Sequence, residues 1–302
     1  MLLKEAVELL APERGGLFVD CTLGLGGHAQ AILEANPNLH LVGIDQDDEA
    51  LAKAGERLAR YAPRLTLVRG NFRQLEALLE PLGLGAPAGI LADLGVSSLQ
   101  LDRAPRGFSF RREGPLDMRM GDGPMSAADV VNTYSEAALE KIFREYGEER
   151  DARRVARAMI KARAEQPLAT TTELAAVIAK AKPRRGAPRE GRVDPATRVF
   201  QALRIEVNQE LAALPELLDQ AVHLLSQDGH LVVISYHSLE DRIVKHTFRD
   251  LARGEVDEVT GRTRSESRLI DVLTKHPVRP SPEEIAENPR SRSARLRAVR
   301  RL

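Results

Sequence analysis

The sequence predicts an α/β fold in which a doubly wound, mostly parallel sheet carries an inserted all-helical domain. Three observations lead to this prediction. Over the first hundred residues, short apolar segments alternate with segments of helical periodicity, as in βαβ units. The middle of the chain then lacks strand-like segments and is mostly helical. A further apolar strand at residues 229–237 puts this helical region between the fourth and fifth strands of the sheet.

Four strands are expected before residue 101, at 17–21, 40–45, 65–70 and 88–93. Helices are expected after the first three of them, at 29–36, 48–61 and 72–82. Ligands of such sheets bind beyond the carboxyl ends of the strands. Asp20, Asp45 and Asp93 lie at three of these ends, so this edge of the sheet is the expected binding site.

The pattern changes beyond residue 100. A loop rich in Gly, Pro and Arg is expected at 101–126, followed by mostly helical residues at 127–181 with a break near Pro167. Residues with capping side chains mark the expected helix starts, at Ser126 and Asp129 and at Thr171 or Thr172. These residues build the helical insertion.

The last third returns to the sheet. Helices are expected at 196–226 and 238–251, on either side of the fifth strand. The segments 268–274 and 295–302 are strand-like and are expected to close the sheet as an antiparallel pair. The chain therefore divides into a discontinuous Rossmann-like domain, residues 1–102 and 207–302, and an inserted helical domain, residues 103–206.

The charges balance as a whole but not locally. The 44 Lys and Arg residues equal the 44 Asp and Glu residues, which excludes a globally basic nucleic-acid binder. Residues 1–100 have a net charge of −5, and residues 101–200 have a net charge of +5. No acid follows Glu287, and the closing segment holds six arginines, Arg290, Arg292, Arg295, Arg297, Arg300 and Arg301. Such runs are often only solvated faces.

Cysteine content and hydropathy limit the class of protein further. Cys21 is the only cysteine, so an intrachain disulfide and a cysteine-based zinc cluster are excluded, and no metal is expected. No apolar run approaches the ~20 residues of a membrane span, and no signal-peptide pattern is found at the N-terminus. We therefore expect a soluble cytoplasmic protein that does not bind membranes.

A glycine loop at residues 20–28 indicates a nucleoside site. Its glycines let the backbone approach a ligand before the N-terminus of a helix. Asp45 ends the next strand, where a carboxylate binds two ribose hydroxyls. Gly26 and Gly27 are adjacent, unlike the spacing that cradles a pyrophosphate, so S-adenosylmethionine fits better than NAD. The alternatives are a tight turn for the loop and a helix cap for Asp45.

Residues near two other strands are further candidates. Asp93 begins the loop after the fourth strand, which in a methyltransferase faces both cofactor and substrate. Ser97 and Gln100 follow in the same loop, with a turn residue and a surface amide as the alternatives. Phe72 follows the third strand and suits the face of an adenine, although a core aromatic is the more common role.

Seven segments together resemble the ribosomal RNA small subunit methyltransferase H family. They occur in order along the chain: GLGGH (24–28), GIDQD (43–47), ADLGVSSLQ (92–100), RGFSF (106–110), PLDMRM (115–120), DPATRVFQALRIEVN (194–208) and SYHSLEDR (235–242). The resemblance implies a class I S-adenosylmethionine-dependent methyltransferase that methylates N4 of a decoding-site cytidine in 16S rRNA. It implies cofactor contacts at Gly26, Gly27, His28, Asp45, Phe72, Asp93 and Gln100.

The catalytic residues are less well indicated. Many amino-methyltransferases carry an Asp/Asn-Pro-Pro-Tyr/Phe motif after the fourth strand, and this chain has Asp-Leu-Gly-Val at 93–96 instead. The groups that replace it are sought among Ser97, Asp102, Asp117, Tyr236 and His237. Tyr236 suits stacking on the target base, and His237 suits proton acceptance at neutral pH. Structural roles for both remain the alternative.

The locally basic middle region is the expected RNA contact, and the inserted domain is the expected substrate-recognition domain. Two groups of cations are candidates, one at Arg103, Arg106, Arg111, Arg112 and Arg119, and one at Lys182, Arg184, Arg185, Arg189 and Arg192. Phe108 and Phe110 suit base stacking between the arginines. A linker is the alternative for 182–192.

The expected partner is 16S rRNA or the small ribosomal subunit, and the sequence leaves monomer and homodimer open. Two other functions stay open as well: an assembly factor that senses S-adenosylmethionine without catalysis, and an NAD-dependent dehydrogenase.

Overall fold

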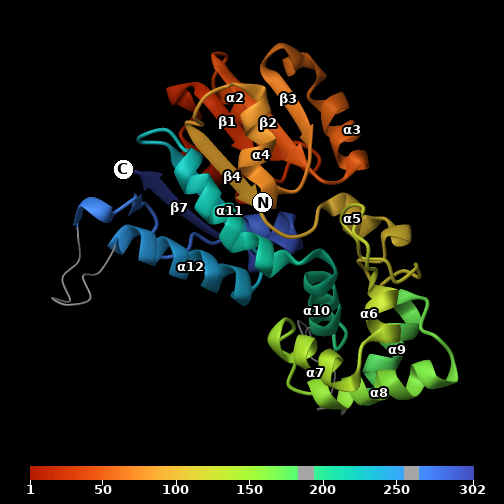
Figure 1. The fold of residues 1–302 in the computed structure, drawn as a ribbon. Coiled ribbons are helices and arrows are strands. Elements are labelled where there is room, and N and C mark those ends of the chain that lie inside the picture. Colours follow the sequence, from red (N-terminus) through yellow and green to blue (C-terminus); the bar gives the residue numbers. More distant parts are fainter. Residues whose placement is uncertain (183–193, 255–264) are drawn as a thin grey trace. The chain divides into compact units, whose positions relative to one another are not determined.

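The computed structural model describes residues 1–182, 194–254 and 265–302 (Figure 1). These residues form two compact units, which we call the sheet unit (1–95 and 211–302) and the helical unit (96–210). The domain boundaries predicted from the sequence lie at 102/103 and at 206/207. In the structure, residues 96–102 and 207–210 therefore belong with the helices of the insertion.

The sheet unit contains a seven-stranded sheet in the order β3-β2-β1-β4-β5-β7-β6. Its strands are β1 (Gly16–Asp20), β2 (Leu39–Asp45), β3 (Leu65–Arg69), β4 (Gly89–Asp93), β5 (His230–Ser235), β6 (Ile270–Val272) and β7 (Arg295–Arg301). The first five strands are parallel to one another, and β7 runs antiparallel to both β5 and β6. The predicted parallel sheet and the antiparallel closing pair are both confirmed.

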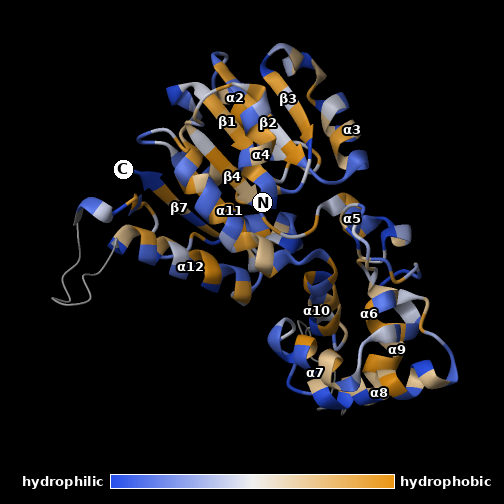
Figure 2. Cartoon of the chain, in the orientation of Figure 1, coloured by the Kyte–Doolittle hydropathy of each residue, from blue (hydrophilic) through white to orange (hydrophobic). Residues whose placement is uncertain are grey.

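Helices cover both faces of this sheet, which is why its central strands are mostly apolar up to the residues at their ends (Figure 2). One face packs against α1 (Leu3–Leu10), α2 (Gly27–Ala35) and α3 (Asp48–Arg57). The other face packs against α4 (Leu75–Leu79), α11 (Glu210–Leu224) and α12 (Ser238–Arg253). Adjacent residues of one strand face opposite layers; Phe18 points into the first and Val19 into the second. The doubly wound α/β fold is thereby confirmed.

The helical unit has its own apolar core. Its helices are α5 (Ser98–Asp102), α6 (Ala127–Thr133), α7 (Glu136–Glu145), α8 (Ala152–Glu165), α9 (Thr171–Ala181) and α10 (Thr197–Asn208). The largest fully buried side chain of this core is Phe143 on α7. Asn208 ties the loop before α6 to α10, because its side chain accepts from the Met120 amide and donates to the Met118 carbonyl, both at 2.8 Å.

Local signals explain most helix starts, with two differences of detail. Ser126 caps α6 in a capping box with Asp129, as predicted. The cap of α9 is Thr170, one residue before the predicted start, because its hydroxyl accepts the Glu173 amide. The helical segment predicted at 196–226 is confirmed but consists of two helices, because α10 and α11 are separated at Gln209, whose φ of 51° is left-handed.

The arginines that close the chain are mostly part of the sheet. β7 lies between β5 and β6, and Arg297 on it is buried with its Nε 2.7 Å from Asp241 Oδ1. Arg300 is ion-paired with Asp271 at 2.8 Å. These side chains serve strand packing and are not an unstructured basic tail. A last short helix, α13 (Pro282–Glu287), precedes them.

In the part of the chain that the structure describes, no helix combines the length and the apolar character that crossing a bilayer requires.

Candidate functional site

The glycine loop joins β1 to α2 and is held by the acid at the end of β2. The Gly24 amide donates to Asp45 Oδ2 at 2.8 Å, and the Asp47 amide donates to Asp45 Oδ1 at 2.9 Å. Each carboxylate oxygen keeps at least one further lone pair. Gly26, with φ of 74°, is the N-cap of α2, and a Cβ on it would lie 3.0 Å from the Leu58 side chain. Asp45 therefore shapes the loop and retains acceptor capacity for hydroxyls.

Three acids converge at this edge of the sheet, at the ends of β1, β2 and β4. Burial, together with the negative charges of Asp93 and Asp45, raises the pKa of Asp20 to about 7. Burial also raises the pKa of Asp45 and of Asp93 above their ordinary values. The cluster is therefore an unfavourable concentration of negative charge that a cationic ligand would stabilise.

Asp20→Asn is expected to stabilise the protein above neutral pH and to have no such effect near pH 4. Asp20 titrates near 7 in the folded chain and near 3.8 unfolded, so its contribution to stability is lost as pH rises through 7. Asparagine keeps an oxygen for the Thr22 amide, which Asp20 accepts at 3.1 Å. The gain in unfolding free energy at pH 8 should be at most about 4 kcal/mol.

Urea unfolding of both proteins at pH 5, 6, 7 and 8 measures this gain. Asp250→Asn, at an exposed position of α12 beside the permanently charged Arg249, is the matched control and should show no trend with pH. A difference between Asp20→Asn and the parent that stays constant from pH 5 to 8 would contradict the assignment.

Asp93 is hydrogen-bonded to a tyrosine from the far end of the sequence. The Tyr236 hydroxyl, directly after β5, donates to Asp93 Oδ1 at 2.6 Å. Burial and the Asp93 charge raise the pKa of Tyr236 well above its usual range, so this hydroxyl remains a donor. The second Asp93 oxygen, Oδ2, lies 3.6 Å from His28 Nδ1. The Tyr236 hydroxyl thus orients the Asp93 carboxylate, and the His28 ring lies close to the second oxygen.

His28 lies in the first turn of α2 and is 9% exposed. Its Nε2 is 3.0 Å from the Met1 carbonyl oxygen. Burial lowers the pKa of the imidazole, so the ring is neutral at pH 7. The structure therefore brings together His28, Asp93 and Tyr236, of which the first two are predicted cofactor contacts and the third a predicted catalytic residue.

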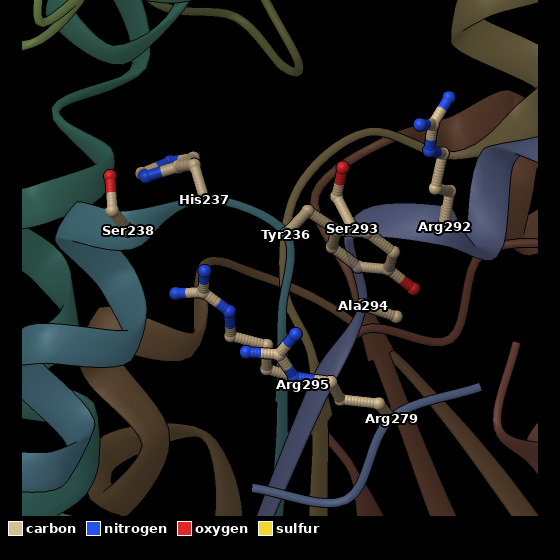
Figure 3. A pocket seen from close by; sticks show the side chains of 8 residues that line it. All are labelled: Tyr236, His237, Ser238, Arg279, Arg292, Ser293, Ala294 and Arg295. Carbon is tan, nitrogen blue, oxygen red and sulfur yellow. The ribbon is translucent and has the colours of Figure 1, made fainter.

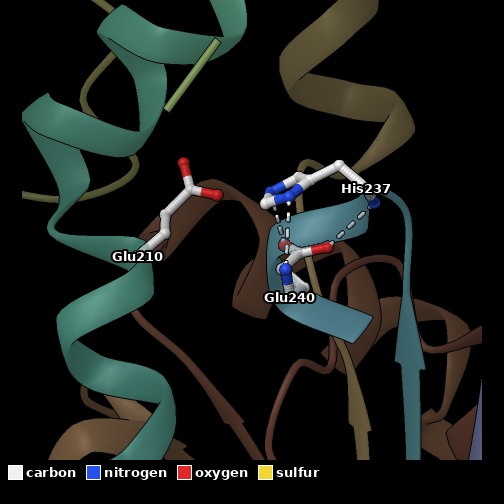
Figure 4. A group of neighbouring side chains, drawn as sticks. All are labelled: Glu210, His237 and Glu240. Atoms are coloured by element: carbon white, nitrogen blue, oxygen red, sulfur yellow. Dashed lines mark hydrogen bonds and ion pairs between the residues drawn. The ribbon is translucent and has the colours of Figure 1, made fainter. Parts of the chain in front are cut away.

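His237 caps the helix that follows Tyr236. Its Nδ1 accepts from the Glu240 amide at 3.4 Å, and its Nε2 lies 3.2 Å from Glu240 Oε1 (Figure 4). Glu240 Oε2 in turn accepts the backbone amides of Tyr236 and His237. This capping box orients the turn that carries Tyr236. The Nδ1 lone pair of His237 accepts the Glu240 amide of the helix. A structural role therefore explains His237 as well as its predicted role as a proton acceptor does.

Glu240, 3% exposed, is missed by the sequence analysis. The signal was present, since an acid three residues after a helix N-cap marks a capping box, but histidine is an uncommon cap.

A pocket of about 360 Å³ opens beside this turn (Figure 3). It is lined by Tyr236, His237 and Ser238 after β5 and by three arginines, Arg279, Arg292 and Arg295. Arg279 and Arg292 are exposed, and Arg295 is half-buried. Of these arginines, the sequence analysis names Arg292 and Arg295 only as members of the closing arginine run.

Phe72 and Gly27, two other predicted cofactor contacts, lie in the sheet unit. Phe72 is half-buried and packs against the apolar layer that contains α4 and α11. Core packing thus explains part of its ring, and its predicted contact with an adenine stays a prediction. Gly27 begins α2, and a Cβ on it would meet nothing within 4 Å.

Four predicted site residues lie in the helical unit and have local partners there. Ser97 caps α5, accepting the Gln100 amide at 3.2 Å while Gln100 Oε1 accepts the Ser97 amide. Asp102 ends the same helix. Asp117 binds Arg119 through both carboxylate oxygens at 2.8 Å, which lowers its pKa and makes it a weak proton acceptor. Their predicted roles in cofactor binding and catalysis stay predictions.

The predicted RNA-contact cations are only partly described. Arg184, Arg185, Arg189 and Arg192 lie outside the described residues. Lys182 is within them and is paired with the buried Glu149. Phe110 packs edge-on against Phe200 at 5.0 Å, and Phe108 is 8% exposed, so both aromatics contribute to the helical core.

Comparison with known proteins gives consistent matches along the chain. A sequence profile of the MraW methylase family matches residues 1–302. Ribosomal RNA small subunit methyltransferase H of Geotalea daltonii is 52% identical over 302 residues, which cover 99% of this chain and 96% of that protein. The protein of the same name from Heliobacterium mobile is 48% identical over 308 residues, covering 100% of this chain and 98% of its own.

Proposed function

The chain belongs to the MraW methylase family, and we propose that it methylates N4 of a decoding-site cytidine in 16S rRNA. Membership makes the chain an enzyme, a methyltransferase that depends on S-adenosylmethionine. The proteins that it resembles at about half of all positions are named as methyltransferases of the small-subunit ribosomal RNA. The nucleotide and the atom that receive the methyl group are part of the proposal.

The residues at the carboxyl edge of the sheet fit the cofactor. Asp45 has lone pairs left for ribose hydroxyls after binding the amides of Gly24 and Asp47. The acids at the ends of β1, β2 and β4 favour a ligand with positive charge, and S-adenosylmethionine carries a sulfonium and an ammonium group. When bound, it supplies an electrophilic methyl group at this edge.

The chemical difficulty lies with the cytidine, because the lone pair of N4 is delocalised into the ring. A group that accepts a hydrogen bond from the amine returns electron density to nitrogen and later receives its proton. Asp93 suits this role in addition to the predicted cofactor contact. It lies at the end of β4, and its orientation is set by the Tyr236 hydroxyl at 2.6 Å.

The observation that carries the proposal is this hydrogen bond at the binding edge. Tyr236 is held on its own turn by Glu240, so the pair is positioned from both sides. A positioned carboxylate replaces the backbone carbonyl and aromatic ring of the Pro-Pro-Tyr motif that this chain lacks. The target base must leave its stack to reach such a site.

A methylation assay tests the proposed function. The protein is incubated with methyl-labelled cofactor and with small-subunit particles or naked rRNA, and the modified nucleoside is identified by mass spectrometry. We expect N4-methylcytidine at one position. Cofactor binding without label on any cytidine would favour the sensing assembly factor. Tight NAD binding without binding of S-adenosylmethionine would favour the dehydrogenase.

The remaining parts of the proposal follow from the substrate. Residues 96–210 recognise the RNA, and the cytoplasm, where ribosomal subunits assemble, is the location. Neither a metal ion nor a membrane is part of the proposed chemistry, and monomer and homodimer both stay open.

A further inference from the structure

We propose that the arginine pocket beside Tyr236 binds an RNA phosphate next to the target nucleotide. We use the name arginine pocket for the hollow whose lining includes Tyr236, Ser238, Arg279, Arg292, Ser293 and Arg295 (Figure 3). The inference rests on the proposed function, since it names the part of the RNA that this chain holds outside the reacting base.

The pocket has excess positive charge. Asp241 is the carboxylate partner of Arg295, at 3.2 Å, and it is shared with Arg297 at 2.7 Å. Within residues 1–182, 194–254 and 265–302, neither Arg279 nor Arg292 has an ion pair or a hydrogen bond through its side chain. A pocket lined by three arginines, two of them without a compensating acid, favours an anionic ligand.

The backbone that carries these arginines is well fixed. Val278 and Leu296 form an isolated antiparallel bridge with two hydrogen bonds of 2.9 Å, which holds Arg279 beside the start of β7. The turn before Arg292 is closed by the buried Ser291, whose hydroxyl donates to the Asn288 carbonyl at 2.8 Å. The cations are thus presented from an ordered frame, which reduces the entropy that binding must overcome.

The chemistry of the lining favours a phosphate over a base or a sugar. Arginine offers only donors, in a planar fork that matches a phosphate group. The hydroxyls of Ser238 and Ser293 add polar groups that donate as well. If a cytosine bound here, the arginines would offer no acceptor for the hydrogen bonds that its amine donates. A phosphodiester, which only accepts, matches the donors of the arginines and of Ser293.

The location connects this anion site to the reacting group. Tyr236 lines the pocket and binds Asp93 through its hydroxyl, so one side chain separates the two. A nucleotide whose base reaches Asp93 carries its own phosphates only a short distance away. The pocket would therefore fix the strand next to the flipped base and place the amine at the acceptor.

The test measures RNA binding separately from turnover. Arg279→Gln, Arg292→Gln and the double variant are compared with the parent for binding to a transcribed 16S rRNA fragment that spans the decoding region, across several salt concentrations. We expect the dissociation constant of the double variant to rise about tenfold and the slope of log affinity against log salt to fall by between about one and two. Affinity for S-adenosylhomocysteine should not change.

Arg249→Gln is the matched control, because it removes the same charge from a site about 16 Å further along α12 than Ser238. Arg249 is exposed there and pairs with Asp250. It should bind RNA like the parent. Equal RNA affinity and equal salt slope for the parent and the double variant would overturn the proposal. A loss of cofactor affinity without a loss of RNA affinity would also overturn it, since the pocket would then bind the carboxylate of the cofactor.

A second measurement keeps the proposal testable if a variant folds poorly. Single phosphates on either side of the target are replaced by neutral methylphosphonates in a synthetic RNA. The parent should lose affinity at one or two of these positions, and Arg292→Gln should lose less at the same positions. An equal loss for both proteins at every position would count against the pocket. Because no turnover is needed, a parent that binds RNA without methylating it contradicts only the proposed function.

Discussion

Asp93→Asn is expected to reduce methyl transfer at saturating substrates by at least about 100-fold. Asparagine has nearly the same shape and still accepts the Tyr236 hydroxyl, so the local packing should survive. It lacks the negative charge that draws density onto the amine nitrogen and that favours a cationic cofactor. Single-turnover methylation, with calorimetric titration of S-adenosylhomocysteine alongside, separates the loss in rate from any loss in cofactor affinity.

Tyr236→Phe is the informative companion to this variant. The tyrosine hydrogen bond lowers the pKa of Asp93, so removing it should raise that pKa. If the anionic carboxylate is the active form, the acidic limb of the rate profile should then move to higher pH. A near-normal rate for Asp93→Asn, or an unshifted profile for Tyr236→Phe, would remove Asp93 from the reaction.

Asp45→Ala is expected to weaken cofactor binding by more than about 1 kcal/mol, which is roughly fivefold or more. The charge-assisted contact to the ribose is lost, and so are the acceptors for the Gly24 and Asp47 amides. The glycine loop therefore loses its support together with its ligand contact. Calorimetric titration with S-adenosylhomocysteine measures the change directly.

Asp48→Ala provides the control for this variant. Asp48 lies three residues further on, is 67% exposed and pairs with Arg69 at 2.8 Å. An exposed pair contributes little, so cofactor affinity should be unchanged. If Asp45→Ala binds the cofactor as tightly as Asp48→Ala does, Asp45 only supports the backbone at Gly24 and Asp47, since the N-cap of α3 is Asp47.

The regular part of the fold is predictable because its signals are local. Each parallel strand is a short apolar run that ends in a turn, and this pattern follows from burial on both faces. The break between α10 and α11 is not predictable in this way. It depends on a left-handed Gln209, a residue without a strong preference for that conformation, between two stretches of good helix formers.

In the candidate site, likewise, contacts between residues close in sequence are predictable and contacts between distant residues are not. Asp45 and the glycine loop are close in sequence, and their hydrogen bond could be anticipated from the strand–loop–helix pattern. The contact of Tyr236 with Asp93 joins residues 143 positions apart. This contact exists because β4 and β5 are neighbours in the sheet. The hydrophobic periodicity of the sequence does not predict which strands are neighbours. The arginine pocket depends on β7 in the same way.

The position of β7 between β5 and β6 also constrains how the chain is made. Among the strands of the described residues, β6 pairs only with β7, and β7 follows it by more than twenty residues. On the ribosome, residues 270–272 therefore leave the exit tunnel before the strand that receives them exists. Until residues 295–301 emerge, β5 has an open edge and the arginines of the pocket have no fixed places. The frame of the proposed arginine pocket thus forms only after residues 295–301 have emerged, later than the strands that carry Asp93 and Tyr236.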